Sequence, residues 1–134
     1  MGLFSFMFGS QAAESAKPPK SAISLQQLED MFANMRANTK WNLDGELLWG
    51  YFFTDPDAKR LEPLSKYLSA DGYHVVAIYP TDDRSTNVLH VERVEHLTPN
   101  TLDVRNQEFE ALAKKFEIAT YDGMDAGPAL TGSH

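Results

Sequence analysis

The most regular hydrophobic segment of the chain is Leu47–Phe53, LLWGYFF, between an Asp-Gly pair and a Thr-Asp-Pro-Asp segment. A short apolar run, rich in aromatic residues and bounded by turn signals, predicts a buried strand rather than a helix. Because side chains alternate along a strand, Leu48, Gly50 and Phe52 share one face and the other residues share the opposite face. Both faces are apolar, as is typical of a central strand. We expect a helix over the Leu48/Phe52 face, with Gly50 permitting its close approach.

Other segments show helical or strand patterns. Apolar residues at helical spacing predict a helix over Leu25–Ala37, and Ser24 and Gln27 before it form a capping-box pattern. The remaining predicted elements, in order, are a helix between Thr54 and Gly72, a strand Tyr73–Tyr79, a hairpin loop Asp82–Asn87, a strand Val88–Leu97, a helix starting at Thr98-Pro99, and a short strand Ile118–Tyr121 closed by Asp122-Gly123.

After the first helix the predicted order is strand, helix, strand, strand, helix, strand. This order predicts an α+β fold: a ferredoxin-like βαββαβ sandwich with a four-stranded antiparallel sheet, plus an extra N-terminal helix. The expected core includes Trp49, Gly50, Phe52, Phe109, Phe116 and Gly123.

One face of the predicted sheet carries too many apolar residues to be left bare. Its members are Trp49, Tyr51, Phe53, Val75 and Tyr79. If the two helices of the sandwich cover the Leu48/Phe52 face, this second face needs another cover. We expect the extra helix Leu25–Ala37 to supply it.

The chain is expected to hold a single folded domain at residues 24–125, preceded by a disordered tail and linker at 1–23 and followed by a C-terminal tail at 126–134. Met1–Phe8 is apolar but far too short to span a bilayer, and it lacks the basic start of a secretory signal. We expect a disordered tail there. The alternative is a segment that touches a membrane or docks on a partner.

Composition narrows the function. The net charge is −7 and the chain has no cysteine, which excludes disulfides and thiol chemistry. A nucleic-acid binder needs clustered Lys and Arg, and the third predicted strand, VLHVERVE, also lacks the aromatic residues on which RNA-binding sheets stack bases. We therefore expect no direct nucleic-acid binding. The acidic balance favours a basic protein partner, or simply solubility.

The candidate chemical groups form no recognised site. His90, Glu92 and His96 share a predicted strand face and are suitable ligands for zinc, but their spacing matches no known motif, and a solvated face is the favoured interpretation. The acidic pairs Asp55/Asp57 and Asp82/Asp83 stand in turns, where Asp accepts hydrogen bonds from the backbone. We expect no metal, no cofactor and no enzymatic activity.

Two segments resemble a known family. LTPNTLDVRNQEFEALAKKFEIATYDG, at Leu97–Gly123, and WGYFFTDPDAKRLEPLSKYLSADGYHVV, from Trp49, are similar to the regulator of ribonuclease E activity B family. The matching positions are Ala113, Phe116, Tyr121, Asp122 and Gly123. The resemblance implies a small acidic cytoplasmic protein with a ferredoxin-like fold. It also implies a non-enzymatic regulator that binds ribonuclease E and inhibits RNA cleavage.

The partner-binding residues expected on this basis are Tyr121, Asp122, Asp82, Asp83 and Glu92. Two interpretations of Tyr121-Asp122-Gly123 stay open: a strand end followed by a turn with Gly123 at positive φ, or part of the partner surface. Two other functions also stay open. One is an immunity-type or scaffold protein that masks a different basic partner; the other is an undescribed enzyme with a polar pocket at His90 and Glu92.

Overall fold

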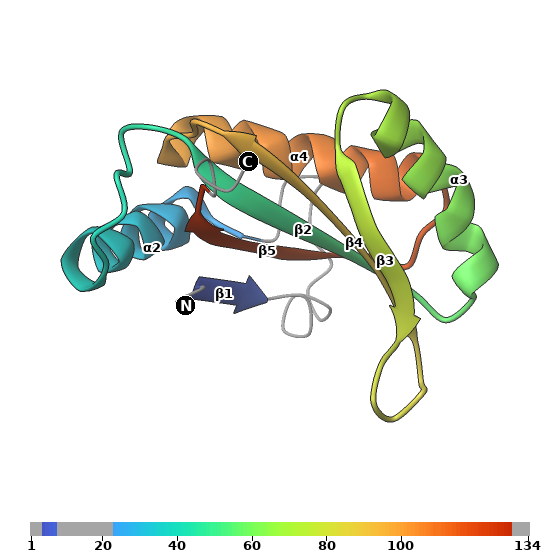
Figure 1. Cartoon of the computed structure of the whole chain (residues 1–134). Coiled ribbons are helices and arrows are strands. Elements are labelled where there is room, and N and C mark those ends of the chain that lie inside the picture. Colours follow the sequence, from blue (N-terminus) through green and yellow to red (C-terminus); the bar gives the residue numbers. More distant parts are fainter. Residues whose placement is uncertain (1–3, 8–22, 130–134) are drawn as a thin grey trace.

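The computed structural model describes residues 4–7 and 23–129 (Figure 1). Its elements, in chain order, are β1 (Phe4–Met7), α2 (Leu25–Asn38), β2 (Leu47–Asp55), α3 (Ala58–Ala70), β3 (His74–Pro80), β4 (Asn87–Glu95), α4 (Pro99–Lys115) and β5 (Thr120–Pro128). The strands form one antiparallel sheet, against which the helices pack.

The sheet confirms the predicted topology. Its strand order is β1-β5-β2-β4-β3, and apart from β1 this is the order of a ferredoxin-like βαββαβ sandwich. The apolar strand β2 is central, as its two apolar faces indicated. It pairs with β4 from Leu47↔Glu95 to Asp55↔Asn87, and its other edge pairs with β5.

β1 is an edge strand that the sequence pattern did not predict. It pairs with β5 from Phe4↔Ala126 to Met7↔Gly123 and so covers backbone groups on the edge of β5. The prediction of a disordered tail over Met1–Phe8 is therefore wrong for the four residues of β1. The predicted linker at 8–22 lies outside the described residues, as do residues 1–3 and 130–134.

The helices α2 and α4 begin at the polar caps that the sequence predicted, and α3 ends next to the predicted Gly72. The backbone N–H of Gln27 donates to Ser24 Oγ at 3.1 Å, and the N–H of Ser24 donates to Gln27 Oε1 at 2.8 Å, which is the predicted capping box of α2. Thr98 and Thr101 make the same reciprocal pair at the start of α4. α3 ends at its cap Asp71 and is followed by Gly72 at φ 100°, a conformation that favours glycine.

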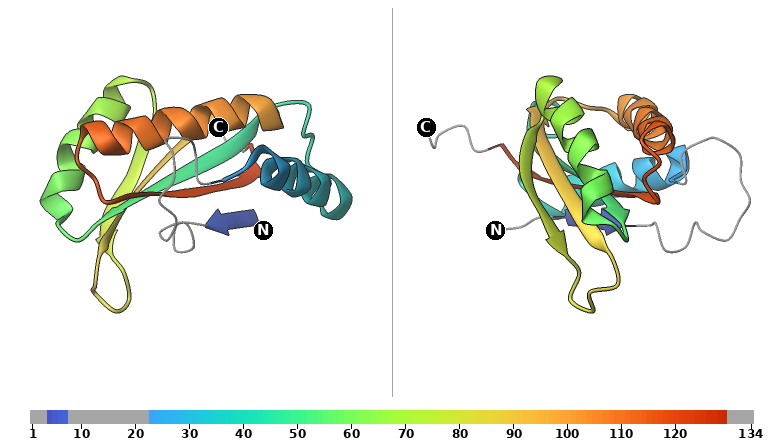
Figure 2. Two further views of the ribbon diagram at one scale, coloured as in Figure 1. Left: turned by 180° about the vertical axis from the view of Figure 1, so that it is seen from behind. Right: turned by 90° about the vertical axis from the view of Figure 1, so that its right-hand side faces the viewer.

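All the described helices pack on one face of the sheet, and it is not the face that the sequence led us to expect for α3 and α4 (Figure 2). The rings of Tyr51 and Phe53 contact Phe109 of α4, and Trp49 stacks on Phe32 of α2 with centroids 5.8 Å apart. The large aromatic face is thus buried beneath α4 and α2 together. Burying this face removes more apolar surface from water than burying the Leu48/Phe52 face would.

The last strand corrects a second prediction. β5 does not stop at Tyr121 but continues to Pro128, so Asp122-Gly123 is not a closing turn. Phe52 and Phe53 are neighbours in β2, yet they pair with Gly123 and Tyr121, which leaves Asp122 as the extra residue of a β-bulge. Gly123 has φ 116°, so the predicted positive φ is present, inside a strand rather than in a turn.

Candidate protein-binding surfaces

The residues predicted to bind a partner do not form one patch. Tyr121 is only 4% exposed; its ring contacts Phe53 and Phe109, and its hydroxyl donates a 2.6 Å hydrogen bond to Asn106 Oδ1. Its side chain therefore belongs to the core and is not available to a partner in this fold. Asp122, next to it in the bulge, is half-buried, and burial raises the pKa of its carboxyl.

Asp82 and Asp83 lie at the tip of the β3–β4 hairpin, which projects beyond the rest of the sheet (Figure 1). Asp83 Oδ1 accepts hydrogen bonds from Thr81 Oγ1 and from the backbone and side chain of Ser85, at 2.8–3.0 Å. These bonds, first of all the one from the Ser85 backbone, lower the pKa of the Asp83 carboxyl. Asp83 therefore shapes the turn, as predicted, and keeps its negative charge at an exposed tip.

No described element covers the second face of the sheet, which we call the open face (Figure 2). The strand register places on it Leu48, Gly50, Phe52, His74, Ala77, Tyr79, Val88, His90, Glu92, Val94 and Asp125. Tyr79 and Val94 are 41% and 43% exposed. Neither Lys nor Arg is among these residues, so the open face combines exposed apolar groups with carboxylates and histidines.

The centre of the open face is organised around Gly50. A Cβ at this position would lie 2.9 Å from His90 Nε2 and would also collide with Asp125 Oδ1. The close approach that Gly50 permits is therefore made by two polar side chains and not, as predicted, by a helix. His90 in turn stacks on Phe52 with centroids 4.4 Å apart.

The electrostatics of this cluster follow from its partial burial. Burial and the neighbouring charge of Glu92 raise the pKa of Asp125 to about 6, while the Gly50 backbone acts in the opposite direction. Burial also lowers the pKa of His90, against the effect of Glu92. Near neutral pH the Asp125 carboxyl has largely lost its proton and His90 is mainly neutral, so the centre of the open face, which also holds Glu92, is acidic.

The candidate metal ligands of the sequence do not come together in the described residues. In residues 4–7 and 23–129, no group of three His, Asp or Glu side chains is placed to hold a metal ion, and this includes His90, Glu92 and His96. Asp57, from one of the acidic pairs, caps α3 by accepting from Lys59 N at 2.9 Å, in agreement with the predicted turn role.

Beneath α4, a charged network anchors the helix to the sheet. Arg105 donates to both carboxylate oxygens of Glu95, at 2.5 and 3.0 Å, and also to the hydroxyl of Tyr51 at 3.3 Å. Burial alone would lower the pKa of Arg105, but its hydrogen bonds to Glu95 outweigh this effect and hold the pKa above its usual range. The pair is bidentate and half-buried, so its role is structural.

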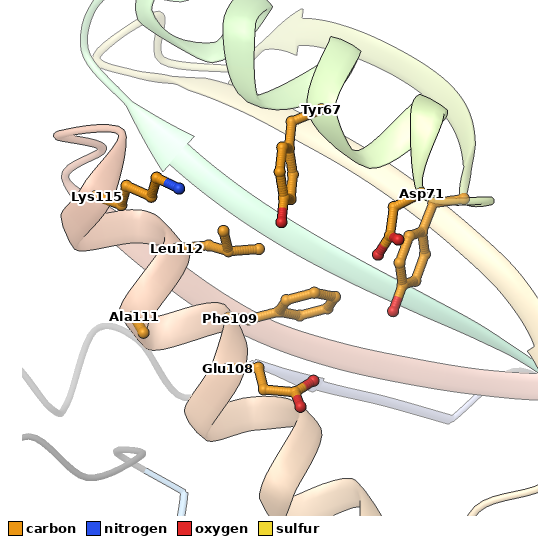
Figure 3. A pocket seen from close by; sticks show the side chains of 8 residues that line it. Tyr67, Asp71, Glu108, Phe109, Ala111, Leu112 and Lys115 are labelled. Carbon is orange, nitrogen blue, oxygen red and sulfur yellow. The ribbon is translucent and has the colours of Figure 1, made fainter.

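A cleft of about 410 Å³ opens between the C-terminal parts of α3 and α4 (Figure 3). It is lined by Tyr67, Asp71, Tyr73, Glu108, Phe109, Ala111, Leu112 and Lys115. Tyr73 and Phe109 are buried, at 5% and 2% exposed, whereas Tyr67 is 43% exposed. The cleft thus has an aromatic interior and a charged rim.

Sequence reasoning missed Asp125 and the cleft. Asp125 lies between the core residues Met124 and Ala126, and this alternation of buried and polar residues indicates a strand. The sequence prediction ended the domain at residue 125 and therefore did not use this signal. The cleft depends on the relative positions of α3 and α4. The hydrophobic periodicity of each helix does not predict how the two helices are placed.

Comparison with known proteins gives one positive result. The family model for "Regulator of ribonuclease activity B" matches residues 25–126, from the first residue of α2 into β5. A search of curated proteins finds no match. Among the described residues, no helix has the length and apolar character needed to cross a membrane. Since the matched segment covers most of the chain and coincides with the fold described above, this protein belongs to the regulator of ribonuclease activity B family.

Proposed function

We propose that the protein is a non-enzymatic regulator that binds a ribonuclease of the ribonuclease E type and slows its cleavage of RNA. The observation that carries this proposal is the family match over residues 25–126, because it runs from α2 through most of β5 and so covers nearly all of the ferredoxin-like unit. A cytoplasmic location is part of the same proposal, because it would bring the protein together with such a ribonuclease.

The open face is the docking surface in this proposal. Exposed apolar residues next to carboxylates, without Lys or Arg, are complementary to a segment that is both basic and apolar. Glu92 and Asp125 supply the negative charge at its centre. Asp82 and Asp83 at the hairpin tip, and Asp122 in the bulge, add further negative charge. We assign these carboxylates to partner binding, and we leave out Tyr121 because its side chain is buried.

A charge-reversal pair tests the surface. Glu92→Lys changes the open face, and Glu29→Lys makes the same change in net charge on exposed α2, on the helix-covered side of the sheet. Binding of each purified variant to the ribonuclease E of the source organism is measured by calorimetry. We expect Glu92→Lys to weaken binding by roughly 1–3 kcal/mol, the range for an interface charge, and Glu29→Lys to have little effect.

Asp122→Asn tests the bulge separately, since it keeps the side-chain shape and removes the charge. A fold of unchanged stability with weaker binding supports the assignment of Asp122 to the partner surface. Wild-type stability together with wild-type binding removes Asp122 from it. If no variant and not even the wild type binds the ribonuclease, the proposal fails, and another basic protein becomes the partner to seek.

A further inference from the structure

The cleft between α3 and α4 has features of a binding site that the proposed function does not use. Its lining residues come mainly from α3 and α4, so it lies on the helix-covered side of the molecule, away from the open face (Figure 3). Its volume, about 410 Å³, is sufficient for a large side chain. Tyr67 is 43% exposed and its ring offers aromatic surface, while Tyr73 and Phe109 form the buried wall behind it. Aromatic faces attract cations.

The aromatic groups around this cleft already attract cations of the chain itself. The guanidinium carbon of Arg93 lies 4.5 Å from the centroid of the Tyr73 ring, and that of Arg105 lies 5.7 Å from it. Lys115 Nζ lies 5.8 Å from the centroid of Tyr67. Of these three cations only Lys115 lines the cleft, so the interior is not filled by an arginine of this chain.

The charges on the rim are separated. Asp71 and Lys115 lie at different ends of the cleft, with Tyr67 between them (Figure 3). Glu108 is two helical turns, roughly 10 Å, from Lys115 along α4. Within the described part of the chain no cation pairs with the Asp71 carboxylate. Glu108 makes a loose ion pair, at 3.6 Å to Arg105 Nε, and its side chain is 62% exposed.

We infer that this cleft receives an arginine side chain from a protein partner. The guanidinium lies between the Asp71 and Glu108 carboxylates and stacks on the exposed ring of Tyr67, while the aliphatic stem packs against Leu112. Arginine suits this site better than lysine because its planar group stacks on rings and binds two carboxylates at once. Lys115, at the other end, stays in place. Arg105 is already paired with Glu95, which reduces its repulsion of an incoming cation.

The probe that tests this inference is a capped pentapeptide, Gly-Ser-Arg-Ser-Gly. Its control is the same peptide with citrulline, which has the shape of arginine without the charge. Each is titrated into the full-length protein, and amide and aromatic NMR signals are followed. We expect saturable shifts for Tyr67, Tyr73 and Phe109 with the arginine peptide, and at least fivefold weaker binding of the citrulline peptide.

Two variants locate the effect. Asp71→Asn is expected to weaken the arginine peptide at least fivefold and leave the citrulline peptide unchanged, and Tyr67→Leu, which keeps an apolar group but removes the ring, is expected to weaken the arginine peptide several-fold. Glu29→Gln on α2 serves as the control and should bind like the wild type. Equal binding of the two peptides, no shifts at tens of millimolar peptide, or shifts confined to the open face would overturn the inference. None of these readouts uses a ribonuclease, so this test and that of the proposed function fail independently.

Discussion

The carboxyl group of Asp125 in β5 lies against Gly50 in β2, in the space that the Cβ of any other residue at position 50 would occupy. This arrangement draws a carboxyl group partly out of water on an otherwise uncovered sheet face. The pKa of Asp125 is raised to about 6 as a result, by burial and by Glu92. The open face therefore gains negative charge as the pH rises through about 6.

This pKa predicts how stability depends on pH. Because the folded state holds the Asp125 proton more tightly than the unfolded state, the free energy of unfolding falls as the pH rises from about 4 to above 6. After allowance for partial exposure, we expect the loss from this group to be about 1–2 kcal/mol. Asp125→Asn removes the loss, so its stability relative to the wild type should increase over the same pH range. Urea unfolding of both proteins at several pH values checks this; parallel stability curves would show that Asp125 has no raised pKa.

Gly50→Ala tests the cause of the shift. The new Cβ would collide with the ends of the Asp125 and His90 side chains, which can move outward into solvent. We expect the pKa of Asp125 to fall toward its ordinary value of 3.8, with a net change in stability at pH 7 of less than about 1 kcal/mol. A carboxyl ¹³C NMR titration measures the pKa directly. An unchanged value in the variant would mean that Gly50 does not control the burial of Asp125.

Tyr121→Phe tests whether this tyrosine is a core residue. The substitution removes the 2.6 Å hydrogen bond to Asn106 Oδ1, and Asn106 Nδ2 already has no partner among the described residues. We expect the free energy of unfolding to fall by about 1–3 kcal/mol, the cost of an unsatisfied buried group. Tyr79→Phe, at an exposed position on the open face, is the matched control and should change it by less than about 0.5 kcal/mol. Similar effects in both variants would contradict the structural role given to Tyr121.

Gly123→Ala tests the β-bulge. An alanine at φ 116° is strained, so we expect a loss of about 1–3 kcal/mol in the free energy of unfolding. Among the described glycines, Gly72 and Gly123 have a positive φ and Gly45 does not. A Cβ at Gly45 would contact mainly the side chain of Asn42, which can move. Gly45→Ala is therefore expected to cost less than about 1 kcal/mol. If Gly123→Ala is as stable as Gly45→Ala, the bulge does not require glycine.

Local signals in the sequence were sufficient for the topology. The capping box at Ser24 and Gln27, the proline at Pro99 and the two-faced apolar strand Leu47–Phe53 each act within a few residues, and together they gave the correct order of elements. The errors arose where a choice depended on distant partners. Asp122-Gly123 is a common turn pair, but pairing with β2 draws it into a strand.

The choice of sheet face failed for the same reason. Both faces of β2 are apolar, so periodicity alone could not show which one the helices cover. The aromatic contacts of Phe109 and Phe32 decide it, and these come from segments far apart in the chain. The polar cluster around Gly50 and the cleft between α3 and α4 also depend on tertiary packing, and neither was predictable from spacing.

The most direct test of the central claim is the rate at which purified ribonuclease E of the source organism cleaves a fluorogenic RNA as this protein is added. We predict a saturable decrease with the wild type, the same decrease with Glu29→Lys, and a curve shifted roughly tenfold to higher concentration with Glu92→Lys, which corresponds to about 1.4 kcal/mol of binding free energy. A cleavage rate that stays constant with tens of micromolar wild-type protein, with no complex detected in the same mixture, would contradict the account.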